Sequence, residues 1–153
     1  TGALVRAVER AVGRQRPQIY FDRPGNDPSS SEANLSFFSG HATVSFCLAA
    51  FVSRNLSDWL LATSLSRSSP AARLWLGRVL PATVLYGSAA LVGYSRLVDQ
   101  KHYLSDVLIG AAFGGLVGNL VYSLHFDGDG NPRRRYGVQL VPVAAGLGLQ
   151  VTF

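Results

Sequence analysis

The stretch GYSRLVDQKHYLSDVLIG, residues 93–110, decides how this chain folds, because it joins two apolar segments through a short polar one. The first, LPATVLYGSAALVGY (80–94), and the second, VLIGAAFGGLVGNLVYSLHF (107–126), carry no Asp, Glu, Lys or Arg. Both are predicted to be helices, and the second has the roughly 20 residues that can span a bilayer. Because buried charges need partners or a function, the polar segment between them is either an exposed turn or a site.

The remaining apolar segments also favour helices. Residues 3–13 have valines and a leucine on one helical face, and Gly13 ends the pattern. Further helices are expected at 41–54 and, in a more polar form, at 57–66, with a turn and a restart at Ser69-Pro70. Glycines recur at every fourth position of 107–126, so another helix can approach closely there (Gly110, Gly114 and Gly118). The fold class is therefore mainly α, a helical bundle.

Two segments depart from the helical pattern. Residues 14–36 are rich in Pro, Ser, Asn and Asp and are predicted to form a long irregular loop, a kind of loop that often carries function. The tail alternates in two halves around Ala145-Gly146, which predicts a C-terminal β-hairpin after a turn. We therefore expect a helical domain at 1–126, with the turn and hairpin of 127–153 packed on it.

Composition limits the function classes. The net charge of +5 suits a partner that carries phosphate or an anionic membrane surface. The sequence contains no basic helix interleaved with aromatic residues, so it gives no sign of a nucleic-acid partner. The one cysteine, Cys47, cannot form an internal disulfide. Because the sequence begins at Thr1 and contains no methionine, we expect a processed or trimmed form.

Three polar clusters lie at the ends of predicted helices, and antiparallel packing brings such ends together. In FSGH (38–41), the start of a helix with Gly40 could bind an anion through its free backbone N–H groups; the alternative is that Ser39 simply caps the helix. In GRQRP (13–17) two arginines either clamp an anion or form a solvated loop. In SRLVDQKHYLSD (95–106) the spacing of four predicts that Asp106 accepts the Nδ1–H of His102, which leaves Nε2 free to attack; alternatively this is a surface pair.

Together the clusters resemble the type 2 phosphatidic acid phosphatases, whose superfamily includes vanadium haloperoxidases and bacterial class A acid phosphatases. That signature is a Lys, six residues and Arg-Pro; then Pro-Ser-Gly-His; then Ser-Arg, five residues, His, three residues and Asp. Ser95-Arg96, His102 and Asp106 fit the third part at every fixed position. Ser39-Gly40-His41 fits most of the second part, and Arg16-Pro17 fits the end of the first. The resemblance covers roughly residues 4 to 122 and implies the helical bundle of that superfamily.

Two positions depart from the signature. Phe38 replaces the usual Pro, which we expect to alter only the loop. Glu9 falls where the family has its phosphate-binding Lys, and an acid there would repel the substrate. Arg10 or Arg6 would then supply the charge from a neighbouring helical position, or a shifted register would use Arg16, six residues and Arg23-Pro24.

The resemblance implies a mechanism without a metal or other cofactor, in which vanadate mimics phosphate and inhibits. His102 is then the nucleophile that forms a phosphohistidine, Asp106 orients it, and His41 protonates the leaving alkoxide. The implied phosphate-binding groups are Arg16, Ser39, Gly40 and Arg96, with Arg10 as a further candidate.

The expected substrate is a phosphorylated lipid at a membrane surface or a small phosphomonoester or diphosphate. We expect a membrane-associated protein of the bacterial cell envelope with its site on the periplasmic side. Two alternatives stay open: a vanadate-dependent haloperoxidase, and a catalytically weakened membrane protein that binds lipid phosphate, which the Glu9 position motivates.

Overall fold

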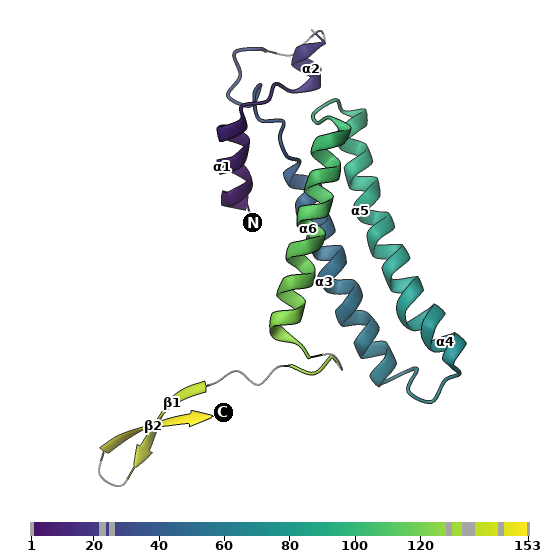
Figure 1. Cartoon of the computed structure of the whole chain (residues 1–153), viewed down its shortest axis with the longest axis vertical. Helices are drawn as coiled ribbons and strands as arrows, with labels where there is room; N and C mark the ends of the chain where they lie inside the picture. Colours follow the sequence, from purple (N-terminus) through teal and green to yellow (C-terminus); the bar gives the residue numbers. More distant parts are fainter. Residues whose placement is uncertain are drawn as a thin grey trace.

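A computed structural model describes residues 2–21, 24, 27–127, 130–132, 137–143 and 146–152. In chain order the elements are α1 (Gly2–Val12), α2 (Pro17–Tyr20), α3 (Gly40–Ala62), α4 (Pro70–Leu74), the π-helical turn η1 (Trp75–Val79), α5 (Leu80–Val98), α6 (Leu104–His125), β1 (Gly137–Val143) and β2 (Gly146–Thr152). Figure 1 shows α3, α5 and α6 side by side, with α1 and α2 near the end where α3 and α6 begin. The prediction of a mainly α helical bundle is confirmed.

The predicted glycine ridge of α6 faces α3. A Cβ built on Gly110 would lie 2.6 Å from the carbonyl oxygen of Ser39, and one on Gly114 would overlap the carbonyl group of Thr43. A Cβ on Gly118 would overlap the carbonyl group of Cys47 in the same way. The two backbones are therefore as close as glycine allows, and this contact fixes where α6 begins relative to the start of α3.

Two predicted helix boundaries were wrong. Residues 41–54 and 57–66 were expected to be separate helices, but α3 runs unbroken from Gly40 to Ala62. The reason is that no Gly or Pro interrupts 54–57, and Ser53 and Ser57 are buried on the same helix face as the core alanines. The restart at Pro70 is confirmed: Ser69 caps α4, its hydroxyl accepting the Ala72 N–H at 3.3 Å. From there the chain stays helical through η1 into α5.

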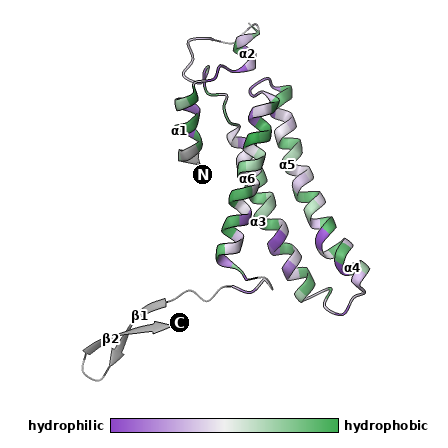
Figure 2. Ribbon diagram, in the orientation of Figure 1, coloured by the Kyte–Doolittle hydropathy of each residue, from purple (hydrophilic) through white to green (hydrophobic). Residues whose placement is uncertain are grey.

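The helices bury small side chains and expose large apolar ones. Ala42, Ala49, Ala50 and Ala89 are buried. Large apolar side chains on α5 and α6 instead face outward, among them Leu91, Leu116 and Leu124, which are 70%, 67% and 63% exposed. Figure 2 shows hydrophobic residues along most of both helices. Within the described residues, two helices, Pro70–Val98 and Leu104–His125, are long and apolar enough to cross a membrane by length and composition.

The predicted hairpin is present, with β1 and β2 antiparallel and Val138 opposite Val151. Its turn residues 144–145 lie outside the described residues, as do residues 133–136 before β1. Figure 1 shows the hairpin apart from the helices. Its packing on the helical domain stays a prediction.

Candidate active site

A cleft of about 330 Å³ opens where the helix ends meet. α1, the following loop, the start of α3, the end of α5 and the turn before α6 all contribute to it. Its lining comprises Val5, Arg6, Glu9, Arg16, Glu32, Gly40, His41, Val44, Arg96, Lys101 and His102. A larger hollow of about 490 Å³ beside α4 contains none of the predicted site residues. The structure therefore gathers both predicted histidines and two predicted arginines in one place.

His102 is held by a backbone group rather than by Asp106. Its Nδ1 lies 2.7 Å from the carbonyl oxygen of Ser36, and because a carbonyl only accepts, Nδ1 carries the proton. In the neutral ring, Nε2 is then the nitrogen with a free lone pair. Only 5% of His102 is exposed, and this burial lowers its pKa below the ordinary value of 6.5, which favours the neutral, nucleophilic form.

The predicted hydrogen bond from His102 to Asp106 is therefore wrong. The Asp106 carboxylate accepts the Tyr103 backbone N–H at 3.0 Å, as the third residue of a helix does in a capping box. It also accepts the Ser36 hydroxyl at 2.6 Å and pairs with Arg14 at 2.5 Å. Asp106 is fully buried, and its link to His102 runs through Ser36, whose hydroxyl binds Asp106 and whose carbonyl binds the imidazole.

The two arginines of GRQRP separate. Arg14 turns to Asp106, and its guanidinium lies 4.1 Å from the centre of the Tyr103 ring. Arg16 lines the cleft, where its Nη1 is 3.2 Å from a Glu32 carboxylate oxygen. The backbone N–H of Arg16 donates to the Ala33 carbonyl at 2.8 Å, so the loop before α3 fixes its position. Arg16 is therefore the member of the pair that can meet a ligand.

Ser39 and Gly40 set the start of α3. Ser39 is fully buried, and its hydroxyl accepts the Ala42 N–H at 3.4 Å as the N-cap of the helix. Its own N–H donates to the Asp106 carbonyl at 3.0 Å, which joins the starts of α3 and α6. A Cβ on Gly40 would lie 3.3 Å from Val5, so glycine lets α1 approach. Gly40 lines the cleft, whereas the contact of Ser39 with a ligand stays a prediction.

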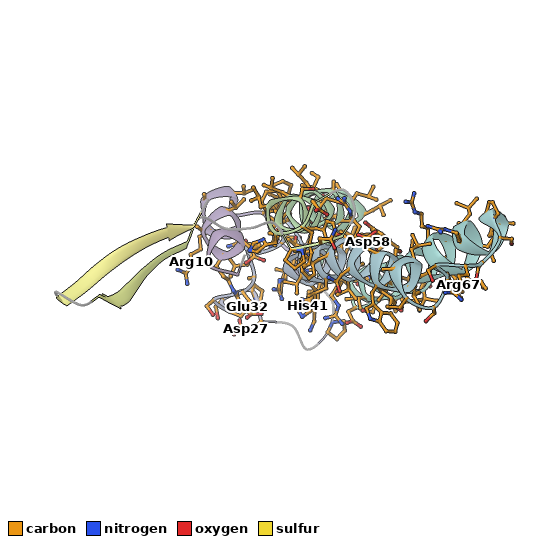
Figure 3. All side chains as sticks on the ribbon, turned by 90° about the horizontal axis from the view of Figure 1, so that it is seen from below. Arg10, Asp27, Glu32, His41, Asp58 and Arg67 are labelled. Atoms are coloured by element: carbon orange, nitrogen blue, oxygen red, sulfur yellow. The ribbon has the colours of Figure 1, made fainter. Side chains whose placement is uncertain are left out.

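His41 is exposed on the cleft and is surrounded by cations. Its pKa is lowered first by partial burial and then by the positive charges of Arg96, Lys101, Arg16 and Arg6. Arg96, in the last turn of α5, pairs with Asp99 at 3.0 Å, and its Nε donates to the Ser95 hydroxyl at 3.1 Å. Figure 3 shows His41 near Glu32 and far from Arg67. An anion entering the cleft would offset these cations and raise the pKa of His41.

Glu9 occupies the wall where the family signature has a lysine. It is 5% exposed, its Oε2 has no hydrogen-bond partner among the described residues, and burial raises its pKa. Arg6 also lines the cleft, with its Nε 3.9 Å from Glu9, whereas Arg10 does not line it. Of the two α1 arginines considered as replacements, the structure thus brings Arg6 to the cleft. Arg23 of the shifted register lies outside the described residues.

Sequence reasoning missed Ser36 and Lys101 as parts of this site. Ser36 lies 66 residues before His102 in the chain, and no spacing rule connects the two. Lys101 adjoins His102, so its cationic side chain beside the predicted nucleophile was the available signal. Among the described residues, no three His, Cys, Asp or Glu side chains form a group that could hold a metal ion. The expectation of a reaction without metal stays a prediction.

Comparison with known proteins gives one family. Residues 1–129 match the PAP2 superfamily. The chain is 34% identical over 125 residues to a PA-phosphatase related-family protein of Dictyostelium discoideum, with 76% of this chain and 41% of that protein covered. It is 35% identical over 105 residues to phospholipid phosphatase 1 of Rattus norvegicus, with 63% and 31% covered. It is 30% identical over 149 residues to lipid phosphate phosphatase 2 of Arabidopsis thaliana, with 86% and 49% covered. The chain thus spans less than half the length of these relatives, and no solved structure matches it significantly.

Proposed function

Because the chain belongs to the PAP2 superfamily, we propose that it is a phosphatase that hydrolyses a lipid phosphate through a phosphohistidine intermediate. One observation carries this proposal: two histidines share a cationic cleft, one buried with its Nδ1 fixed on a carbonyl and one exposed to solvent. Such a pair suits a reaction that needs both a nucleophile and a proton donor. The names of the relatives, which are phospholipid and lipid phosphate phosphatases, support the lipid substrate.

In the first step, the lone pair of His102 Nε2 attacks phosphorus and forms a P–N bond. The bond from phosphorus to the ester oxygen breaks, and the leaving alkoxide takes a proton from His41. In the second step, His41 accepts a proton from water, the resulting oxygen attacks phosphorus, and the P–N bond breaks. Inorganic phosphate leaves, and both histidines return to their starting forms.

Charge stabilisation comes from the groups around the two histidines. Arg16 and Arg96 line the cleft and carry planar forks of N–H donors that match phosphoryl oxygens. The start of α3 adds the Gly40 N–H and the positive end of a helix of 23 residues. Fixed donors of this kind stabilise the charge that spreads over the phosphoryl oxygens in the transition state.

The exposed apolar surface supports a membrane-associated protein that meets its substrate at the lipid headgroup level. Outward leucines on α5 and α6 would face acyl chains, while the cleft lies where these two helices meet in the turn at 99–103. Charged and polar groups at that end would then reach phosphate groups at the membrane surface. The periplasmic side of a bacterial envelope stays a prediction, and the relatives described above come from eukaryotes.

The test is phosphate release from phosphatidic acid in detergent micelles and from p-nitrophenyl phosphate, both with EDTA, by the wild-type chain and by His102→Ala. We expect release that ignores EDTA, favours the lipid and is abolished by His102→Ala, with unchanged helix content by circular dichroism. His41→Ala should lose about 10²- to 10⁴-fold in rate, as expected for a general acid. Full activity of His102→Ala would remove the proposed mechanism. Lipid binding without turnover would favour a weakened binding protein, and halide oxidation that depends on vanadate would favour a haloperoxidase.

A further inference from the structure

Three of the four cationic side chains on the cleft have a carboxylate beside them. Arg96 pairs with Asp99 at 3.0 Å and Arg16 with Glu32 at 3.2 Å, while Arg6 lies 3.9 Å from Glu9. Lys101, the fourth, makes no side-chain hydrogen bond or ion pair among the described residues. Because the three carboxylates offset the three arginines, the net positive charge of the cleft depends on Lys101.

The turn between α5 and α6 holds Lys101 at this position. The Lys101 backbone N–H donates to the Arg96 carbonyl at 3.1 Å, and the preceding Gln100 adopts a left-handed conformation with φ 52°. The Gln100 carbonyl in turn accepts the Gln18 N–H at 3.0 Å from α2. These hydrogen bonds fix the backbone of Gln100 and Lys101. The Lys101 ammonium group, in contrast, is exposed at the end of a flexible side chain next to His102.

We propose that Lys101 binds the phosphate group of the substrate. From the turn before α6, its side chain supplies the positive charge that is missing on α1, where Glu9 stands in place of a lysine. The inference rests on the proposed function, because it assigns Lys101 to the same site. The ligand it fits is a terminal phosphate dianion, whether on a lipid or free, since an unpaired point charge attracts a dianion more strongly than the paired arginines do. Lys101 also contributes to the cationic field at His41, which places its charge within reach of the reaction.

The first experiment compares Lys101→Gln and Lys101→Arg with Arg67→Gln, a matched loss of one positive charge at an exposed site far from His41. Lys101→Gln should raise KM for phosphatidic acid by about tenfold or more, the usual size of a lost charged hydrogen bond. Lys101→Arg should recover most of this loss, and Arg67→Gln should behave as wild type. An unchanged KM in Lys101→Gln, with an active wild type, overturns the inference and leaves the proposed function intact.

A second experiment needs no turnover, because Lys101 is the single lysine of the sequence. The full chain in detergent is acetylated with N-hydroxysuccinimide acetate, and mass spectrometry follows the peptide that contains Lys101. Inorganic phosphate, compared with sodium chloride at equal ionic strength, should slow this acetylation in both wild type and His102→Ala. Equal rates with and without phosphate overturn the inference. Protection in a chain that releases no phosphate would support Lys101 while removing the proposed enzymatic function.

Discussion

The contact between α3 and α6 is built differently in its middle and at the cleft. In the middle, at Gly114 and Gly118, it consists of glycines against backbone, so the two helices must lie close together there. At the cleft it consists of buried polar groups, with Asp106, Ser36 and Ser39 each satisfied by named partners. The comparison teaches that the glycines set the distance between the two helices, whereas the polar groups set the direction in which the histidine side chain points.

The largest effect is expected from Gly114→Ala, which tests whether the glycines set the distance between α3 and α6. The new Cβ would overlap the Thr43 carbonyl group, and backbone cannot move aside as a side chain can, so we expect a loss of about 3 kcal/mol or more in unfolding free energy. Gly115→Ala is the matched control, because nothing lies within 4 Å of its Cβ. Thermal unfolding by circular dichroism should show the control unchanged or up to about 1 kcal/mol more stable. Equal stability of the two variants would show that the glycines do not set the helix distance.

Ser36→Ala tests whether the buried polar groups orient His102, and it should have an intermediate effect. It removes the hydroxyl that donates to Asp106 at 2.6 Å but keeps the carbonyl that binds His102. We expect about 1–3 kcal/mol lower stability, because a buried carboxylate oxygen loses a donor, and a lower kcat with a loosened imidazole. Ser29→Ala, an exposed serine of the same loop that binds Asp27, should change stability by less than about 0.5 kcal/mol. A wild-type kcat in Ser36→Ala would show that the hydrogen bond to Asp106 does not contribute to the orientation of His102.

Glu9→Gln should have the smallest effect, and its sign depends on pH. Burial raises the pKa of Glu9, so the folded chain binds a proton more tightly than the unfolded chain, and stability falls as pH rises above the ordinary value of 4.5. Glutamine keeps the shape without the charge. We expect Glu9→Gln to have a higher Tm than wild type at pH 8, by at most about 4 °C, and an equal Tm at pH 4. A variant that is less stable at pH 8 would show that the carboxylate makes a favourable interaction.

The sequence predicted what depends on local pattern. The glycine spacing of α6 and the alternation of the tail were visible in the residues themselves, and so was the restart at Pro70. The arrangement around His102 was not, because two acceptors competed for its Nδ1–H. Asp106 stood at a suitable spacing, yet the start of α6 used its carboxylate for the Tyr103 N–H, and a carbonyl 66 residues away took its place. Likewise, both Arg14 and Arg16 are positively charged, so the sequence alone could not show that Arg14 pairs with Asp106 while Arg16 lines the cleft.

The acceptor that fixes the His102 ring belongs to the main chain, and this has a consequence for how the site can change. An amino-acid exchange at position 36 alters the side chain but leaves the carbonyl in place. Point mutation at that position can therefore weaken the hold on the loop without deleting the group that selects the tautomer. We expect His102 to lose this orientation completely only if the loop itself is displaced, so insertions and deletions before α3 should be more damaging than substitutions within it.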